Sequence, residues 1–248
     1  MRIVTTGAQV QTESRFIQNR GIFWILGICG AVALGGAFLY RDTCKPRKGI
    51  TVLGSFARIG HALKNRVFTA RLFLFSILAM QYSSFLAASS FVYQIQFKLS
   101  AQEFSAFFAF NAVFSLLGPI IHITFLSKLA KKKIIFWEIL TPTIFGGLII
   151  IFGGVSPWLF ALLMIPITFF GAALRAPATV LMMQPLHGDN GVASSLIQCC
   201  AMIFGSLSML LATLGFWPMP SMAIGFIVAI IGAFAFIYWL RLSKTINE

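Results

Sequence analysis

Acidic residues are the scarcest feature of this chain, since only 6 of its 248 residues are Asp or Glu. Charged residues of both signs make up 10%, against about 25% in an average soluble protein. So low a charge content excludes a disordered chain, because disordered segments are polar and rich in charge. The four cysteines are also few, and two of them, Cys199 and Cys200, are adjacent. Such spacing argues against a disulfide framework.

Motifs of nucleotide-dependent or metal-dependent enzymes are missing. The sequence contains no Gly-x-x-x-x-Gly-Lys-Ser/Thr phosphate loop, which argues against an ATP-driven pump. It contains no His-Glu-x-x-His or Cys-x-x-Cys pair, the spacings that favour a metal site. We therefore expect no cofactor, no metal and no enzymatic activity.

Apolar residues, in contrast, are abundant, at 58% of the chain with 27 phenylalanines. A soluble domain of this size cannot bury so much apolar surface, so the composition predicts an all-α polytopic membrane protein. A spanning helix needs about 20 apolar residues. Charge-free runs and the turn residues that interrupt them predict seven spans, at 21–40, 72–97, 104–127, two within 139–174 and two within 190–240.

Basic residues are distributed unevenly between the two sides of these predicted spans. One side holds fifteen of the Lys and Arg residues and the other holds four. Because cytoplasmic loops carry the basic excess, the richer side and the C-terminus are predicted to be cytoplasmic. The predicted organisation is a polar N-terminal segment (1–20), one span (21–40), a basic cytoplasmic linker (41–71), a six-helix block (72–241) and a tail (242–248). A linker ahead of six closely spaced helices is typical of the second half of a two-repeat transporter.

Several short segments carry a family resemblance that covers roughly residues 19–242. They are NRGIF at 19–23, QFKLSAQEF at 96–104, FFAFNA at 107–112, LGP at 117–119 and GVASS at 191–195. In order and spacing they resemble the Bcr/CflA drug-resistance branch of the major facilitator superfamily. The resemblance implies the sixth helix and the C-terminal half of a transporter, with the first five helices missing.

The resemblance also implies a function and a set of partners. It implies multidrug efflux across the bacterial inner membrane by alternating access and proton antiport, with drug-like substrates, protons and the lipid bilayer as partners. A separate N-terminal half would complete the transporter, and no nucleic acid is expected. Two alternatives stay open: a carrier of another small solute, such as an organic acid, sugar or siderophore, or a non-transporting fragment of an interrupted gene.

Three polar residues within apolar helices are candidates for substrate binding. Arg175 lies deep in an apolar run, where a charge is costly and faces a cavity or a partner, unless its side chain snorkels to the headgroups. Gln81 is an amide in the middle of a helix, where it either contacts substrate or bridges helices. Asn111 shares a helix face with His122, eleven residues later. The resemblance puts Gln81 and Arg175 on cavity-lining helices.

A compact basic turn follows the third predicted span, at Lys128, Lys131, Lys132 and Lys133. It resembles the second-half copy of the superfamily's cytoplasmic basic motif, which implies a role in locking one conformation. A cluster that only sets topology explains the same residues equally well.

Overall fold

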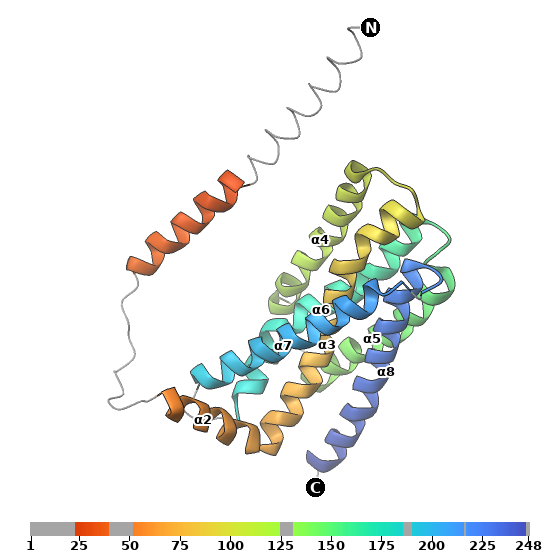
Figure 1. The fold of residues 1–248 in the computed structure, drawn as a ribbon. Helices are drawn as coiled ribbons and strands as arrows, with labels where there is room; N and C mark the ends of the chain where they lie inside the picture. The colour runs from red at the N-terminus through yellow and green to blue at the C-terminus, as the bar shows by residue number, and fades with distance from the viewer. Residues whose placement is uncertain (1–22, 40–51, 125–130, 186–189, 216, 247–248) are drawn as a thin grey trace, which may run out of the picture. The chain divides into compact units, whose positions relative to one another are not determined.

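The structure is a computed structural model that describes residues 23–39, 52–124, 131–185, 190–215 and 217–246. The chain divides into two units, Met1–Ile50 and Thr51–Glu248. The first unit contributes one described helix, Phe23–Leu39. The second contains every labelled helix of Figure 1. Within the described residues there is no strand, so the all-α prediction is confirmed.

Six long helices occupy the range in which the sequence predicts a six-helix block, and a shorter helix, α2, precedes them. The third helix, α3, ends in a wider π-helical turn, η1, which continues its direction. Their bounds are α2 Val52–Lys64, α3 Arg66–Ser90, η1 Phe91–Gln96, α4 Ala101–Thr124, α5 Lys131–Phe152, α6 Pro157–Met183, α7 Asn190–Thr213 and α8 Pro220–Ile246.

Five of these helical segments are long and apolar enough to cross a membrane, and the chain is an integral membrane protein on this evidence. They are Arg66–Gln96, Ala101–Thr124, Pro157–Met183, Gly191–Thr213 and Pro220–Arg241. Two shorter apolar helices, Phe23–Leu39 and Ile139–Phe152, fall at the other two predicted spans. The count of seven spans stays a prediction.

The predicted linker differs from the structure at its C-terminal end. Residues Val52–Lys64 form the helix α2, and α3 begins at Arg66, six residues before the expected start at residue 72. Asn65 separates the two helices with an extended backbone (φ −72°, ψ 104°). Its side-chain oxygen accepts hydrogen bonds from the amides of Val67 and Phe68, as an N-cap residue does. The charge pattern alone gave no sign of this cap.

The short connection between η1 and α4 is a polar hairpin, as the sequence predicts. Its backbone turns at Lys98, whose φ of 54° is positive. Ser100 and Glu103 then form a capping box: the Glu103 carboxylate accepts from the Ser100 amide and hydroxyl at 2.8 Å each, and the Ser100 hydroxyl accepts from the Glu103 amide at 3.3 Å. This box fixes the start of α4.

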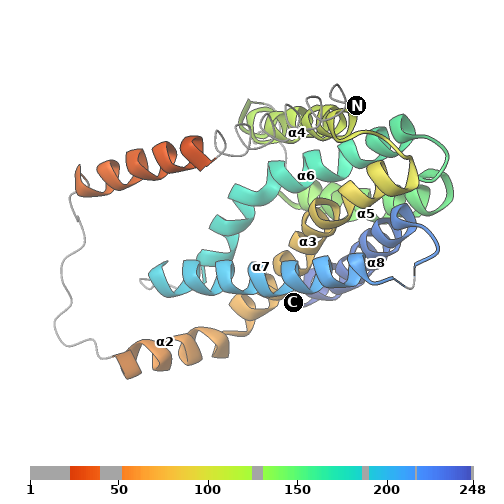
Figure 2. The ribbon, with the colours of Figure 1, turned by 45° about the horizontal axis from the view of Figure 1, so that its top comes forward.

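Three helix pairs organise the bundle: α5 with α8, α3 with α7, and α4 with α6. In Figures 1 and 2, α4 lies at the edge of the bundle beside α6. The backbones of α5 and α8 approach each other closely, because glycines remove side chains from their interface. A Cβ placed on Gly146 would lie 2.6 Å from the Ala229 amide nitrogen, and one on Gly232 would lie 2.7 Å from that of Thr143. Small residues of this kind let helix backbones approach each other in a membrane.

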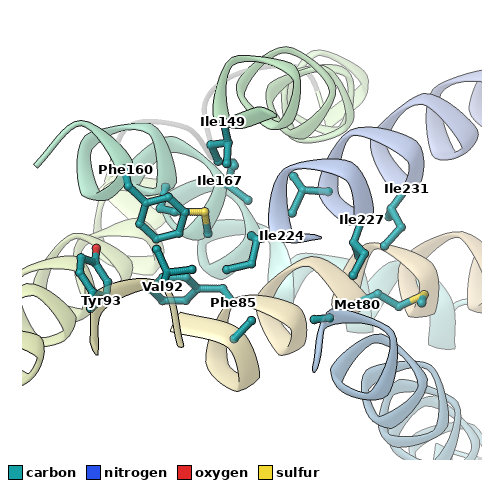
Figure 3. Close-up of a cluster of buried hydrophobic side chains, with 14 of the residues drawn as sticks. Met80, Phe85, Val92, Tyr93, Ile149, Phe160, Ile167, Ile224, Ile227 and Ile231 are labelled. Carbon is teal, nitrogen blue, oxygen red and sulfur yellow. The ribbon is translucent and has the colours of Figure 1, made fainter. Parts of the chain in front are cut away.

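The main core lies mostly between α3, η1, α6 and α8, with Ile149 of α5 and Ala212 of α7 completing it. Its largest fully buried side chains include Phe85, Tyr93, Phe160 and Ile224. Figure 3 shows Tyr93 at one edge of this cluster, beside Val92 and Phe160. We call a second, smaller cluster the end cluster; it joins α2 to the ends of α3, α6 and α7 and consists of Ala62, Phe68, Leu72, Ala178, Met182 and Ala193.

Candidate functional site

The packed face of α6 is interrupted by two exposed residues, Gly171 and Arg175, which we call the α6 window. Residues three or four apart share a helix face. On this face Met164 and Thr168 are buried before the window, and Ala178 is buried after it. A Cβ built on Gly171 meets no atom within 4 Å. Open space therefore lies in front of α6, one turn before Arg175.

Arg175 lies well inside the length of its helix. It lies eighteen residues after Pro157, the first residue of α6, and eight before Met183, the last. The helix therefore continues for two turns beyond Arg175. The 27-residue helix is about 40 Å long, whereas the hydrocarbon core of a bilayer is about 30 Å thick. With the helix centred in the bilayer, Arg175 lies about 7 Å inside the core boundary. A guanidinium at this depth needs water, a headgroup or a polar partner.

The two predicted amide residues lie inside the packed bundle. Gln81 on α3 is 5% exposed and Asn111 on α4 is 2% exposed. Both side-chain nitrogens, Nε2 of Gln81 and Nδ2 of Asn111, lack a hydrogen-bond partner. Leaving a buried donor unsatisfied costs about 1–3 kcal/mol, so a buried amide of this kind is where a bound polar group would be stabilised.

An aromatic contact relates these two amides to each other. The rings of Phe85 and Phe108 stack, with centroids 5.9 Å apart, and join α3 to α4. Gln81 comes four residues before Phe85, and Asn111 comes three residues after Phe108. Because α3 and α4 follow each other through a short hairpin and run in opposite directions, both amides lie one turn from the ring pair on the same side. The Tyr93 hydroxyl, also buried without a partner, lies two turns beyond Phe85.

The three predicted substrate residues therefore fall in two environments. Gln81 and Asn111 are enclosed by packed side chains, and Arg175 is exposed. His122, which shares a helix face with Asn111, is half-buried, and its Nδ1 lacks a partner. Of the three predicted substrate residues, only Arg175 has an exposed side chain.

The predicted basic turn is mostly outside the described part of the chain. Lys128 lies outside the described residues, and α5 begins at Lys131. The side chains of Lys131, Lys132 and Lys133 also lie outside it. Neither the locking role nor the topology role of these four lysines is tested.

Two polar residues that the sequence did not single out join the α2–α3 corner to the end of α6. The Arg71 guanidinium donates to the Leu181 carbonyl at 2.8 Å. The side-chain amide of Asn65 donates to the Pro185 carbonyl at 3.2 Å. The last carbonyls of a helix have no partner within the helix, so Arg71 satisfies a carbonyl of the last turn of α6, while Asn65 bonds the chain just beyond the helix end. In the sequence, the only signal for this corner is Asn65 itself, because Asn at the boundary of a polar and an apolar segment is typical of a helix N-cap.

Within the described residues, no group of three His, Cys, Asp or Glu side chains is placed to hold a metal ion. No protein-family model, curated protein or solved structure matches this chain. The candidate site is the α6 window, whereas Gln81 and Asn111 are separate buried polar groups, each one turn from the ring pair of α3 and α4.

Proposed function

We propose that this chain is the C-terminal part of a proton-coupled exporter of the major facilitator type in the bacterial inner membrane. Its substrates are hydrophobic, drug-like molecules. Support comes from the resemblance of the segments at 19–23, 96–104 and 191–195 to the Bcr/CflA branch. Further support comes from six helices that follow a basic segment and pack as one bundle. Seven spans with a cytoplasmic C-terminus belong to this proposal.

The α6 window is the observation that carries the proposal. A secondary transporter needs a polar group at membrane depth that a solute reaches from water. Arg175 supports this interpretation, since its side chain is exposed and Gly171, one turn away, faces open space. Drug-like molecules combine an apolar body with a few polar groups, and binding sites for them combine apolar walls with a few well-placed polar groups. The guanidinium is the polar group in this interpretation.

Proton coupling requires a carboxylate that this chain does not offer at mid-membrane depth. Within α3–α8 the only acidic residues are Glu103 and Glu138, each in the first eight residues of its helix. We assign the coupling carboxylate to a separate N-terminal half, which packs on the side of α6 that bears the window. In one conformation an acidic residue of that half would pair with Arg175. In the other conformation the guanidinium of Arg175 would be free to bind the substrate.

A second function, a carrier of organic anions, is favoured by the charge of Arg175. A guanidinium binds carboxylates through paired hydrogen bonds, which a cationic drug cannot accept. The two functions share the architecture and differ in which solute Arg175 accepts.

Accumulation assays in a drug-sensitive bacterial host test the proposal. The intact chain is expressed together with the N-terminal half of a Bcr/CflA-type exporter. It is compared with Arg175→Ala, Arg175→Lys and the control Lys98→Gln, whose side chain is exposed in the hairpin. Membrane insertion, drug accumulation and equilibrium binding to the purified chain are measured for each. We expect binding and reduced accumulation with the intact chain and the control, and loss of both in Arg175→Ala. An inserted chain that neither binds drug nor changes accumulation contradicts the proposal.

The choice of solute separates the two functions. Cationic and anionic dyes of similar size are compared in the same cells. The organic-anion carrier is identified if the intact chain transports only the anionic dye and Arg175→Ala loses that transport. Retention of charge in Arg175→Lys is expected to preserve part of the activity, because Lys keeps the charge but loses the paired geometry.

A further inference from the structure

We propose that α2 is an interfacial helix whose basic face binds the anionic headgroups of membrane phospholipids. The inference rests on insertion of the chain in a bilayer and does not depend on transport. At 13 residues, α2 is about 20 Å long, too short to cross a hydrocarbon core of about 30 Å. It contains no acidic residue in its sequence, VLGSFARIGHALK. A short, basic, amphipathic helix is suited to lie in the headgroup region.

The two faces of α2 differ in chemistry. Arg58, His61 and Lys64 recur every third residue and therefore share one side of the helix. His61 and Lys64 are exposed. On the other side, Ala62 is 2% exposed within the end cluster, and Ile59, three residues earlier, is half-buried. The side that bears Ile59 and Ala62 thus packs on the bundle, while His61 and Lys64 are presented outward; Arg58 is half-buried between the two sides.

Hydrogen bonds hold α2 at a fixed angle to the membrane helices. The Asn65 amide nitrogen of the backbone donates to the Ala62 carbonyl at 3.1 Å, and the Thr69 hydroxyl donates to the Leu63 carbonyl at 2.8 Å. Both bonds join the last turn of α2 to the first turn of α3. In Figures 1 and 2, α2 accordingly lies across the end of the bundle and does not continue the direction of α3. A helix held across a bundle end lies near the plane of the headgroups.

Charge complementarity identifies the partner. The exposed Arg66 extends the basic side of α2 at the corner, and residues 52–71 contain four Lys or Arg and no acid. Basic residues next to a membrane helix attract the anionic lipids of the leaflet, at about 1 kcal/mol per charge. Exposed apolar side chains at the same corner, Leu63 and Val67, supply contact with the upper acyl chains. An anionic phospholipid satisfies both sets of groups, whereas a soluble anion satisfies only the charges.

Hydrogen exchange of the full chain in nanodiscs tests the proposal. Nanodiscs of phosphatidylcholine alone are compared with nanodiscs that also contain phosphatidylglycerol. Slower exchange of the backbone amides of residues 52–66 is expected only with phosphatidylglycerol. The double variant Lys64→Gln/Arg66→Gln is expected to weaken the apparent affinity for phosphatidylglycerol on the order of tenfold. The control Lys98→Gln removes a basic charge at the hairpin between η1 and α4 and is expected to change nothing.

Three results overturn the proposal. They are equal exchange of residues 52–66 in both lipids, an unchanged phosphatidylglycerol effect in the double variant, and the same slowing produced by inorganic phosphate in neutral nanodiscs. Protection of the α3 and α8 amides in every sample confirms insertion separately. A failure of lipid binding is thereby distinguished from a failure of insertion, and neither measurement depends on drug transport.

Discussion

The α5–α8 contact gives the sharpest test of the packing, through a single methyl group added to Gly146. Its Cβ would lie 2.6 Å from the amide nitrogen and 2.9 Å from the Cα of Ala229, where ordinary contacts are 3.4–4 Å. The neighbouring atoms are backbone, so no side chain can rotate away, and the two helices must separate by roughly 1 Å. Overpacking of this kind costs about 1–3 kcal/mol. We expect Gly146→Ala to lower the free energy of unfolding by this amount.

The adjacent Gly147 provides a matched control. A Cβ on Gly147 meets no atom within 4 Å, so Gly147→Ala adds the same methyl group without a clash. It is expected to leave stability unchanged or raise it by up to about 1 kcal/mol, because Ala favours a helix more than Gly does. Equilibrium unfolding in mixed detergent micelles, followed by circular dichroism, measures both variants. Equal stability of the two would refute the close α5–α8 approach.

Three further substitutions test local contacts by the same unfolding assay. Gln96→Ala removes two hydrogen bonds to the buried Ser221, of 2.9 and 3.0 Å, and is expected to lower the free energy of unfolding by about 1–3 kcal/mol. The control Gln94→Ala, at an exposed position, is expected to lower it by less than about 0.5 kcal/mol. Asn65→Ala removes the cap of α3 and is expected to cost about 1–2 kcal/mol; no loss would contradict the cap. Asn111→Leu removes an unsatisfied buried amide and is expected to be neutral or stabilising, and a large loss would show that the amide has a partner.

The helical content and the positions of the long apolar helices followed from the sequence, because apolar length is the dominant signal in a membrane chain, whereas α2 was not predicted. The division of 139–174 and of 190–240 into two helices each was also correct, since Gly and Pro interrupt these runs, which are too long for one span. The predicted span begins at residue 72 because Arg66 and Arg71 were assigned to the basic linker, whereas the helix α3 already begins at Arg66. The structure shows that basic residues extend the helix beyond its apolar part, where Asn65 caps it.

The candidate site was less predictable than the fold. Helix position alone made Gln81, Asn111 and Arg175 equivalent, as polar residues in apolar runs. Exposure separates them, and exposure depends on how neighbouring helices pack, which periodicity in one helix does not encode. The Arg71–Leu181 hydrogen bond joins residues 110 positions apart, and the periodicity of a single sequence contains no record of such a contact.

Water access at position 175 tests the central claim most directly. Arg175→Cys and the control Ile230→Cys are made in a background without the four native cysteines and are treated with a charged, membrane-impermeant thiol reagent. Ile230 is 62% exposed within an apolar stripe of α8 that also contains Phe226 and Phe234, as expected of a lipid-facing position. We predict rapid labelling of Arg175→Cys, slowed by a transported drug, and no labelling of Ile230→Cys. Equal absence of labelling at both positions would contradict a water-accessible, substrate-facing Arg175.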